Sequence, residues 1–251
     1  MISELSPSEA QGPDPAAERE ARRAARASVA AKLAELETAP VVAAEPANAD
    51  RDAQRERHRR RLLVAELQRA GAPLDAAEFV CAGDLEVTAA IDAVRGGFNV
   101  IAVLGGSVGA GKTIAAVDWL RDAVADPGRW FDGKWYWGDT RPMLFVSAPA
   151  LARWPRYDAK EMARLLQASR LVIDDLGVEF ADAGGSFQAT LEEVIADRIA
   201  NRRLTILSTN LDAPNFKARY GERIADRIRQ SGRFVSVAGP SLRVRLASTS
   251  A

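Results

Sequence analysis

From residue 98 onward, three apolar runs have the pattern of buried strands. They cover residues 98–104, 171–177 and 204–210 and are rich in Val, Ile and Leu. Continuous apolar runs of this length are typical of parallel strands that are buried on both faces of a sheet. Helical patterns over 114–124 and 220–229 come after the first and the third run. This alternation predicts an α/β fold with a mainly parallel sheet between layers of helices.

The amino-terminal part of the chain has a different composition. No Phe, Trp or Tyr precedes Phe79, so we expect the core to begin near residue 75. Residues 1–50 contain fifteen alanines and few large apolar side chains, too few to offset the entropy of ordering the chain. We therefore expect this segment to be a mobile arm with a transient helix over 16–37. A short tail, 246–251, is expected after the folded domain.

The pattern of the next segment, 51–74, predicts a basic helix and a linker. Residues 51–70 contain seven arginines and three acidic residues, a local net charge of +4. The same stretch becomes apolar at Leu62, Leu63 and Leu67. We favour a solvated helix that packs on the domain through these leucines. The alternative is a contact with a protein partner or with a phosphate backbone.

Composition limits the chemistry that the chain can perform. Basic and acidic side chains number 34 each, so no overall positive charge indicates a nucleic-acid partner. The single cysteine, Cys81, cannot form an intramolecular disulfide, and the single histidine, His58, cannot build a multi-histidine metal site. With no long apolar stretch and no leader pattern, we expect a cytoplasmic protein without membrane contact. Catalysis would therefore depend on Lys, Asp, Arg, Asn and the main chain.

The turn after the first apolar run has the spacing of a phosphate-binding loop. Residues 106–113 read GSVGAGKT and lie between a predicted strand and a predicted helix. Its glycines would let main-chain N–H groups converge on a phosphate, and the helix amino terminus would add its dipole. Lys112 would reach the β/γ-phosphate oxygens and Thr113 would bind Mg²⁺. The main chain around the phosphates would come from Gly106, Ser107, Val108, Gly109, Ala110 and Gly111.

Two carboxylates, Asp174 and Asp175, stand near the end of the second apolar run. Ligands of open α/β sheets bind outside the carboxyl ends of the strands, so both acids should face the same crevice as Lys112. Asp174 would hold Mg²⁺, directly or through water, and Asp175 would position or deprotonate the attacking water. The alternative is an ordinary turn after a strand, which the neighbouring phosphate loop disfavours.

The third run and the helical pattern after it offer polar groups with more than one possible role. Asn210 could orient the lytic water or sense the γ-phosphate, or it could simply start a turn. Arg223 and Arg227 are one helical turn apart, so both could approach a nucleotide, including one bound by a neighbouring subunit. Alternatively, Arg227 could pair with Glu222 or Asp226 on its own helix.

Together these motifs resemble the AAA+ ATPases of the bacterial replicative helicase-loader type, the DnaC/DnaI family, which includes phage-borne members. The resemblance covers roughly residues 75–245 and rests on GSVGAGKT, LVIDDLG, ILSTN, YGERIADRIRQSG and GPSLR in this order. It implies a P-loop NTPase of three layers, α/β/α, that binds ATP and Mg²⁺ through Lys112, Thr113 and Asp174. The remaining roles that it implies are Asp175 for hydrolysis, Asn210 as sensor 1, Arg227 as arginine finger with Arg223 as companion, and Arg243 as sensor 2.

The resemblance also implies a function in DNA replication. Self-associated subunits, with the arginine finger acting in trans, would use ATP to load or remodel a hexameric replicative helicase on single-stranded DNA. Residues 1–74 would hold the helicase. Asp175 stands where most AAA+ proteins have Glu, so we expect a slow ATPase that assembly or DNA stimulates.

Two other functions and one segment remain to be placed. A transposition-helper ATPase of the IstB type shares the fold, and a nucleotide-dependent interaction protein with little hydrolysis would need only the binding loop. The aromatic segment 130–137 is expected to pack in the core, or else to stack on single-stranded bases.

Overall fold

The computed structural model describes residues 47–82, 88–125, 129–131, 134–136, 142–154, 158–179 and 185–238. The chain divides into two units, Met1–Asp52 and Ala53–Ala251, and the sheet and pocket belong to the second. Most of the arm, the tail 246–251, Arg243 and the side chains of the segment 130–137 lie outside the described residues. Among the helices that are described, none has the length and apolar character needed to cross a membrane.

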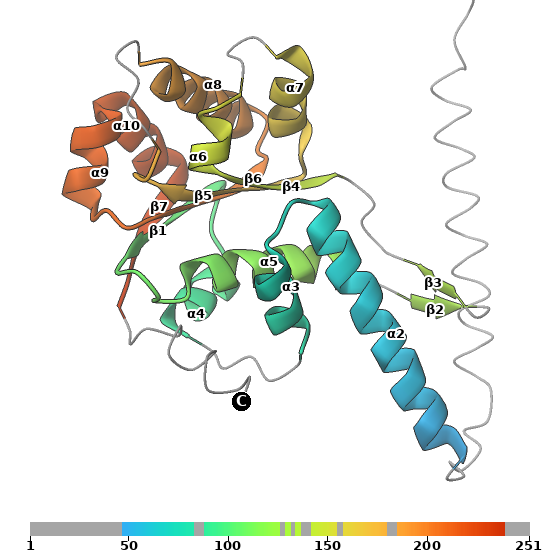
Figure 1. Cartoon of the computed structure of the whole chain (residues 1–251). Helices are drawn as coiled ribbons and strands as arrows, with labels where there is room; N and C mark the ends of the chain where they lie inside the picture. Colours follow the sequence, from blue (N-terminus) through green and yellow to red (C-terminus); the bar gives the residue numbers. More distant parts are fainter. Residues whose placement is uncertain are drawn as a thin grey trace, which may run out of the picture. The chain divides into compact units, whose positions relative to one another are not determined.

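Within these ranges, five strands form a parallel sheet in the order β4-β5-β6-β1-β7 (Figure 1). The three apolar runs are confirmed as strands, and β1 begins at Ile101 rather than at Phe98. β6 lies between β1 and β5, so the strand that precedes the glycine-rich turn and the strand that carries the two acids flank it. A separate antiparallel pair is formed by β2 and β3. The strands are β1 (Ile101–Gly106), β2 (Arg129–Phe131), β3 (Lys134–Tyr136), β4 (Met143–Ser147), β5 (Arg170–Leu176), β6 (Leu204–Thr209) and β7 (Gly232–Val237).

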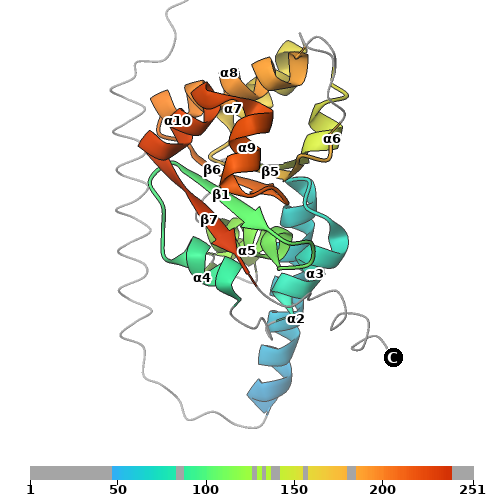
Figure 2. The same cartoon turned by 90° about the vertical axis from the view of Figure 1, so that its left-hand side faces the viewer.

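Helices cover both faces of the five-stranded sheet (Figures 1 and 2). Ile101 and Val103 of β1 pack in an apolar cluster with α6–α10, whereas Ala102 and Leu104 pack in a second cluster with α2–α5. Successive side chains of a strand point to opposite faces, so each strand contributes to both clusters. The three-layer α/β/α fold is thereby confirmed. The helices are α2 (Ala47–Arg69), α3 (Leu74–Cys81), α4 (Ala89–Arg95), α5 (Lys112–Ala125), α6 (Ala148–Leu151), α7 (Ala159–Gln167), α8 (Ser186–Ala200), α9 (Ala213–Tyr220) and α10 (Glu222–Ser231).

The apolar core begins earlier in the chain than the expected residue 75. Leu63 and Leu67 of α2 are 6% and 0% exposed. The Phe145 N–H of β4 donates to the Ala70 carbonyl at 2.7 Å, which ties the end of this helix to the sheet edge. Leucines make these first core contacts, so the first aromatic residue is a poor marker of where the core begins. The helix packs through its leucines, as the favoured interpretation predicted, and most of its arginines are exposed.

Arg198 of α8 is a cation buried in the interior of the fold. Its guanidinium donates to the carbonyls of Leu165 and Ala168 at 2.8 Å and to that of Leu204 at 2.7 Å. It also donates to the Thr205 hydroxyl at 2.7 Å. Burial lowers the pKa of Arg198 to about 10, so the side chain stays charged at neutral pH. This one side chain connects α8 to the end of α7 and to the start of β6.

Replacing Arg198 with Met is expected to lower the free energy of unfolding by about 2–5 kcal/mol, because it leaves several buried carbonyls without a donor. Urea unfolding of the full chain would measure the change. Arg164→Met is the matched control, because Arg164 is half exposed on α7 and pairs with Glu161 at the surface. The control should change stability by less than about 1 kcal/mol. Equal losses in the two variants would contradict this role for Arg198.

Candidate nucleotide-binding site

The glycine-rich turn lies between β1 and α5, as its spacing predicted. Gly109 and Gly111 both have φ +85°, a backbone conformation that glycine adopts without strain. At Gly106, with φ +150°, a Cβ would lie 2.1 Å from the Val237 carbonyl oxygen of β7. Gly106 therefore has no room for a side chain, and the turn leads directly into the amino terminus of α5. A helix start with exposed N–H groups favours an anionic ligand.

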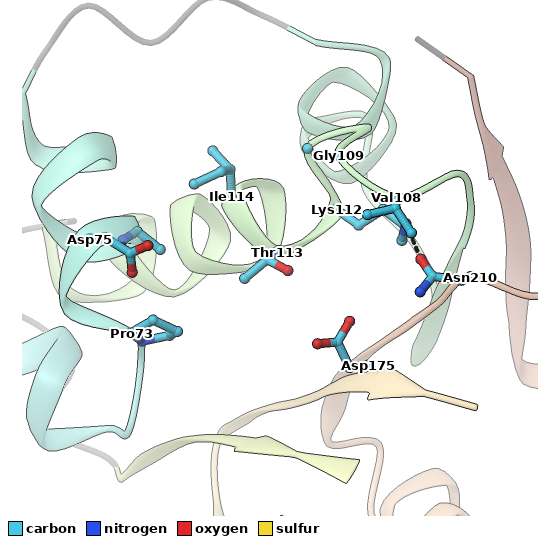
Figure 3. A pocket seen from close by; sticks show the side chains of 11 residues that line it. Pro73, Asp75, Val108, Gly109, Lys112, Thr113, Ile114, Asp175 and Asn210 are labelled. Atoms are coloured by element: carbon cyan, nitrogen blue, oxygen red, sulfur yellow. Dashed lines mark hydrogen bonds between the residues drawn. The ribbon is translucent and has the colours of Figure 1, made fainter. Parts of the chain in front are cut away.

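Lys112, the first residue of α5, is held at the turn by oxygen atoms. Its Nζ donates to the carbonyls of Gly106 at 2.9 Å and Ser107 at 2.7 Å. A third bond, at 3.0 Å, goes to Asn210 Oδ1 at the carboxyl end of β6 (Figure 3). The structure therefore brings Lys112 and Asn210 together from positions far apart in the sequence. The lysine is only 6% exposed, yet it lines the pocket.

Asp174 is buried beside the start of α5. It accepts a hydrogen bond of 3.0 Å from the Thr113 hydroxyl and another from the Ser208 hydroxyl of β6. Burial raises the pKa of Asp174, and these hydrogen bonds act in the opposite direction. The oxygen atoms of Thr113 and Asp174 are the hard donors that Mg²⁺ prefers. The sequence analysis missed Ser208, although its place before Thr209 and Asn210 could have indicated a group at the same strand end.

Asp175 points in a different direction from its neighbour Asp174. It has φ +59°, and the pairing register of β5 with β6 shifts between Ile173 and Leu176. Its N–H donates to the Ser208 hydroxyl at 3.0 Å. The side chain is exposed and turns into the pocket, where Figure 3 draws its carboxylate facing Thr113. The Asp174 side chain therefore lies against the start of α5, whereas the Asp175 side chain points into the pocket.

The pocket that these residues share has a volume of about 220 Å³. Its far wall comes from the start of α3, where Pro73, Asp75 and Ala76 line it (Figure 3). The sequence analysis missed this wall, because these residues precede the loop by thirty or more positions and carry no motif. The other lining residues are Val108, Gly109, Gly111, Lys112, Thr113, Ile114, Asp175 and Asn210.

Arg223 and Arg227 lie on α10 but do not line this pocket. Arg223 is largely exposed and pairs with Glu192 of α8 at 3.3 Å. Arg227 has a buried Nη1 without a hydrogen-bond partner among the described residues. The alternative in which it pairs on its own helix is not supported by the ion pairs, because Glu222 pairs with Lys217 and Asp226 pairs with Arg229. Neither arginine therefore belongs to the group of residues that Lys112, Thr113, Asp175 and Asn210 form around the pocket.

No family model matches this sequence, and no curated protein matches it. Among solved structures, the chain is similar to a crystal structure of DnaI, with 18% identity and a TM-score of 0.48 over 64% of this chain and 88% of that one. It is similar to a crystal structure of the DnaC helicase loader, with 20% identity and a TM-score of 0.47 over 59% of this chain and 86% of that one. It is also similar to a structure of replication initiator DnaA bound to AMPPCP and single-stranded DNA, with 15% identity and a TM-score of 0.45 over 64% of this chain and 50% of that one. Proteins of the kind that the motifs resemble are thus among the structures to which this chain is similar.

Proposed function

We propose that this chain binds and hydrolyses ATP in the pocket between α3, α5 and the carboxyl ends of β5 and β6. The observation that carries the proposal is the convergence of Lys112, Thr113, Asp175 and Asn210 on one pocket, with Asp174 directly behind it. Phosphate oxygens would take the place of the carbonyls that Lys112 now contacts. The N–H groups of residues 106–111 would hold the phosphates, because their glycines keep this part of the backbone open.

Thr113 and Asp174 are the residues that would hold Mg²⁺. When bound, the ion would neutralise negative charge on the phosphates. Their oxygens already lie 3.0 Å apart, and the Ser208 hydroxyl fixes the orientation of the Asp174 carboxylate. These contacts fit a hard divalent cation, since the side-chain polar atoms of Thr113, Asp174 and Ser208 are all oxygens.

Asp175 and Asn210 would act on the attacking water. Asp175 is exposed to the pocket, where it could orient a water and accept its proton. Asn210 can accept a hydrogen bond through Oδ1, as it does from Lys112, and can donate through its amide nitrogen. Aspartate is one methylene shorter than glutamate, so we expect slow turnover that assembly or DNA increases.

We further propose that the chain acts in DNA replication, in the cytoplasm, by loading or remodelling a hexameric replicative helicase on single-stranded DNA. This part rests on the order of the motifs in the sequence. Residues 1–74 would contact the helicase, and the subunits would assemble so that Arg227 enters a neighbouring site. Arg243 would complete the nucleotide site as sensor 2.

Native mass spectrometry of the full chain with the host or phage replicative helicase would test this role. We expect a complex that forms with ATP and is lost in a chain beginning at residue 53. That boundary keeps Leu63 and Leu67, which the core requires. Failure of the full chain to bind the helicase, together with ATP-dependent binding to duplex DNA, would favour the transposition-helper function instead. A helicase complex without measurable ATP hydrolysis would favour the interaction protein.

A further inference from the structure

Glu179 is a buried carboxylate outside the nucleotide pocket. It follows β5 and is only 5% exposed. Its Oε2 accepts from the Gly177 N–H at 2.8 Å. Its Oε1 accepts from Arg219 Nε at 3.0 Å, Arg219 Nη2 at 2.9 Å and the Tyr220 hydroxyl at 2.7 Å. A buried charge is tolerated only with such partners, so this set of contacts holds its members in fixed positions.

One side of this cluster belongs to the turn that carries Asp175. Gly177 has φ +102°, and its N–H bond to Glu179 closes the turn directly after β5. The Thr209 hydroxyl donates to the Leu176 carbonyl at 2.7 Å and ties the same turn to the end of β6. A displacement of Asp175 would therefore act on Glu179 through a short, hydrogen-bonded piece of main chain.

The other side belongs to the end of α9. Arg219 also donates to the Glu179 carbonyl at 2.8 Å, so it hydrogen-bonds to both the side chain and the main chain of Glu179. Burial raises the pKa of the Tyr220 hydroxyl, and the hydrogen bond to Glu179 raises it further. The hydroxyl therefore keeps its proton and remains a hydrogen-bond donor. Gln188 of α8 donates to the Tyr220 carbonyl at 2.9 Å. These bonds fix the last turn of α9 against the β5 turn.

The last turn of α9 leads almost directly into the helix that carries the two arginines. Only Gly221, with φ +89°, separates α9 from α10. α10 packs through the buried side chains of Ile224 and Ile228 and has no side-chain cap at its start. Its amino-terminal end is joined to Tyr220 through one residue and is also held by the ion pairs of Glu222 with Lys217 and of Arg223 with Glu192.

We propose that Glu179 is a positioning residue that couples the nucleotide state of the pocket to the orientation of α10. This inference rests on the proposed nucleotide binding. The bond to Gly177 connects Glu179 to the turn that carries Asp175. When this turn moves, the bonds from Arg219 and Tyr220 to Glu179 would move the α9–α10 junction with it. Arg227 would then reach the site of a neighbouring subunit only when the pocket of its own subunit holds a nucleoside triphosphate.

Hydrogen–deuterium exchange of the full chain, with and without a non-hydrolysable ATP analogue and Mg²⁺, tests the coupling. In the wild type, the analogue should change exchange over residues 213–231. In Glu179→Gln this difference should be lost while the analogue still binds, because the amide N–H₂ of glutamine would face N–H donors. Glu192→Gln is the matched control, since Glu192 contacts Arg223 of α10 but not the β5 turn. It should keep the wild-type response.

Each outcome separates the coupling from the function on which it rests. Failure of the wild-type chain to bind the analogue would overturn both. Binding without a change in α9–α10, an intact response in Glu179→Gln, or an equal loss in Glu192→Gln would overturn the coupling alone. If Glu179→Gln does not fold, Arg219→Lys replaces it. The single ammonium group of lysine cannot reproduce the guanidinium hydrogen bonds to both the carboxylate and the carbonyl of Glu179. A full response in that variant would also overturn the coupling.

Discussion

Lys112→Ala is expected to weaken ATP binding by about 10- to 100-fold. A hydrogen bond to a charged group contributes roughly 1.5–3 kcal/mol, and each 1.4 kcal/mol corresponds to a factor of ten in Kd. The effect should be at the upper end, because Lys112 is the one cationic side chain among the described residues that line the pocket. Asp75 and Asp175 line it as well, so the charged side chains that remain around the pocket in the variant would all be negative.

Isothermal titration of ATP with Mg²⁺ would measure this loss. Lys160→Ala is the matched control, because Lys160 is exposed on α7 and does not line the pocket. The control should bind ATP as the wild type does. Circular dichroism should show that Lys112→Ala remains folded. An unchanged Kd in folded Lys112→Ala would contradict the assignment of the pocket to ATP.

The phosphate loop could be predicted from the sequence because everything that defines it is local. Its glycines, its lysine and its threonine lie within eight consecutive positions, between an apolar run and a helical pattern. The structure confirms the strand, the turn and the helix in this order. The parallel sheet could also be predicted, since its strands are buried on both faces and therefore read as continuous apolar runs.

The division of labour between Asp174 and Asp175 could not be predicted from the sequence. Their separation depends on the positive φ of Asp175 and on the shift in pairing between β5 and β6. An aspartate seldom adopts this conformation, and no local sequence pattern requires it here. The Ser208 hydroxyl, which contacts both residues, comes from the neighbouring strand.

Contacts between distant segments explain the other misses. The α3 wall of the pocket and the four hydrogen bonds to the Glu179 carboxylate connect residues that are separated by thirty or more positions, apart from the bond to Gly177. A single sequence holds no periodicity or spacing that relates such segments. The early start of the core has a different cause, because Leu63 and Leu67 of α2 are already buried, whereas the prediction placed the start of the core by the first aromatic residue.

Arg227→Ala is expected to leave ATP binding intact and to lower turnover only in the assembled state. Arg227 does not line the pocket of its own subunit, so the affinity of an isolated subunit should not depend on it. If its guanidinium stabilises the charge that develops on the phosphates of a neighbouring site, its loss should cost on the order of 10³-fold or more in turnover. Arg229→Ala is the matched control, because Arg229 lies on the same helix, is largely exposed and pairs with Asp226.

Mixing two inactive variants separates an effect in trans from a local defect of α10. Asp175→Asn would have an inactive site but an intact Arg227, whereas Arg227→Ala would have an intact site and no finger. Assembled together, they should recover part of the wild-type turnover, since Arg227 of one variant can complete the site of the other. Steady-state phosphate release at high protein concentration would measure the recovery. Full activity of Arg227→Ala alone, or no recovery in the mixture, would contradict a finger in trans and would leave the buried Nη1 of Arg227 without a functional explanation.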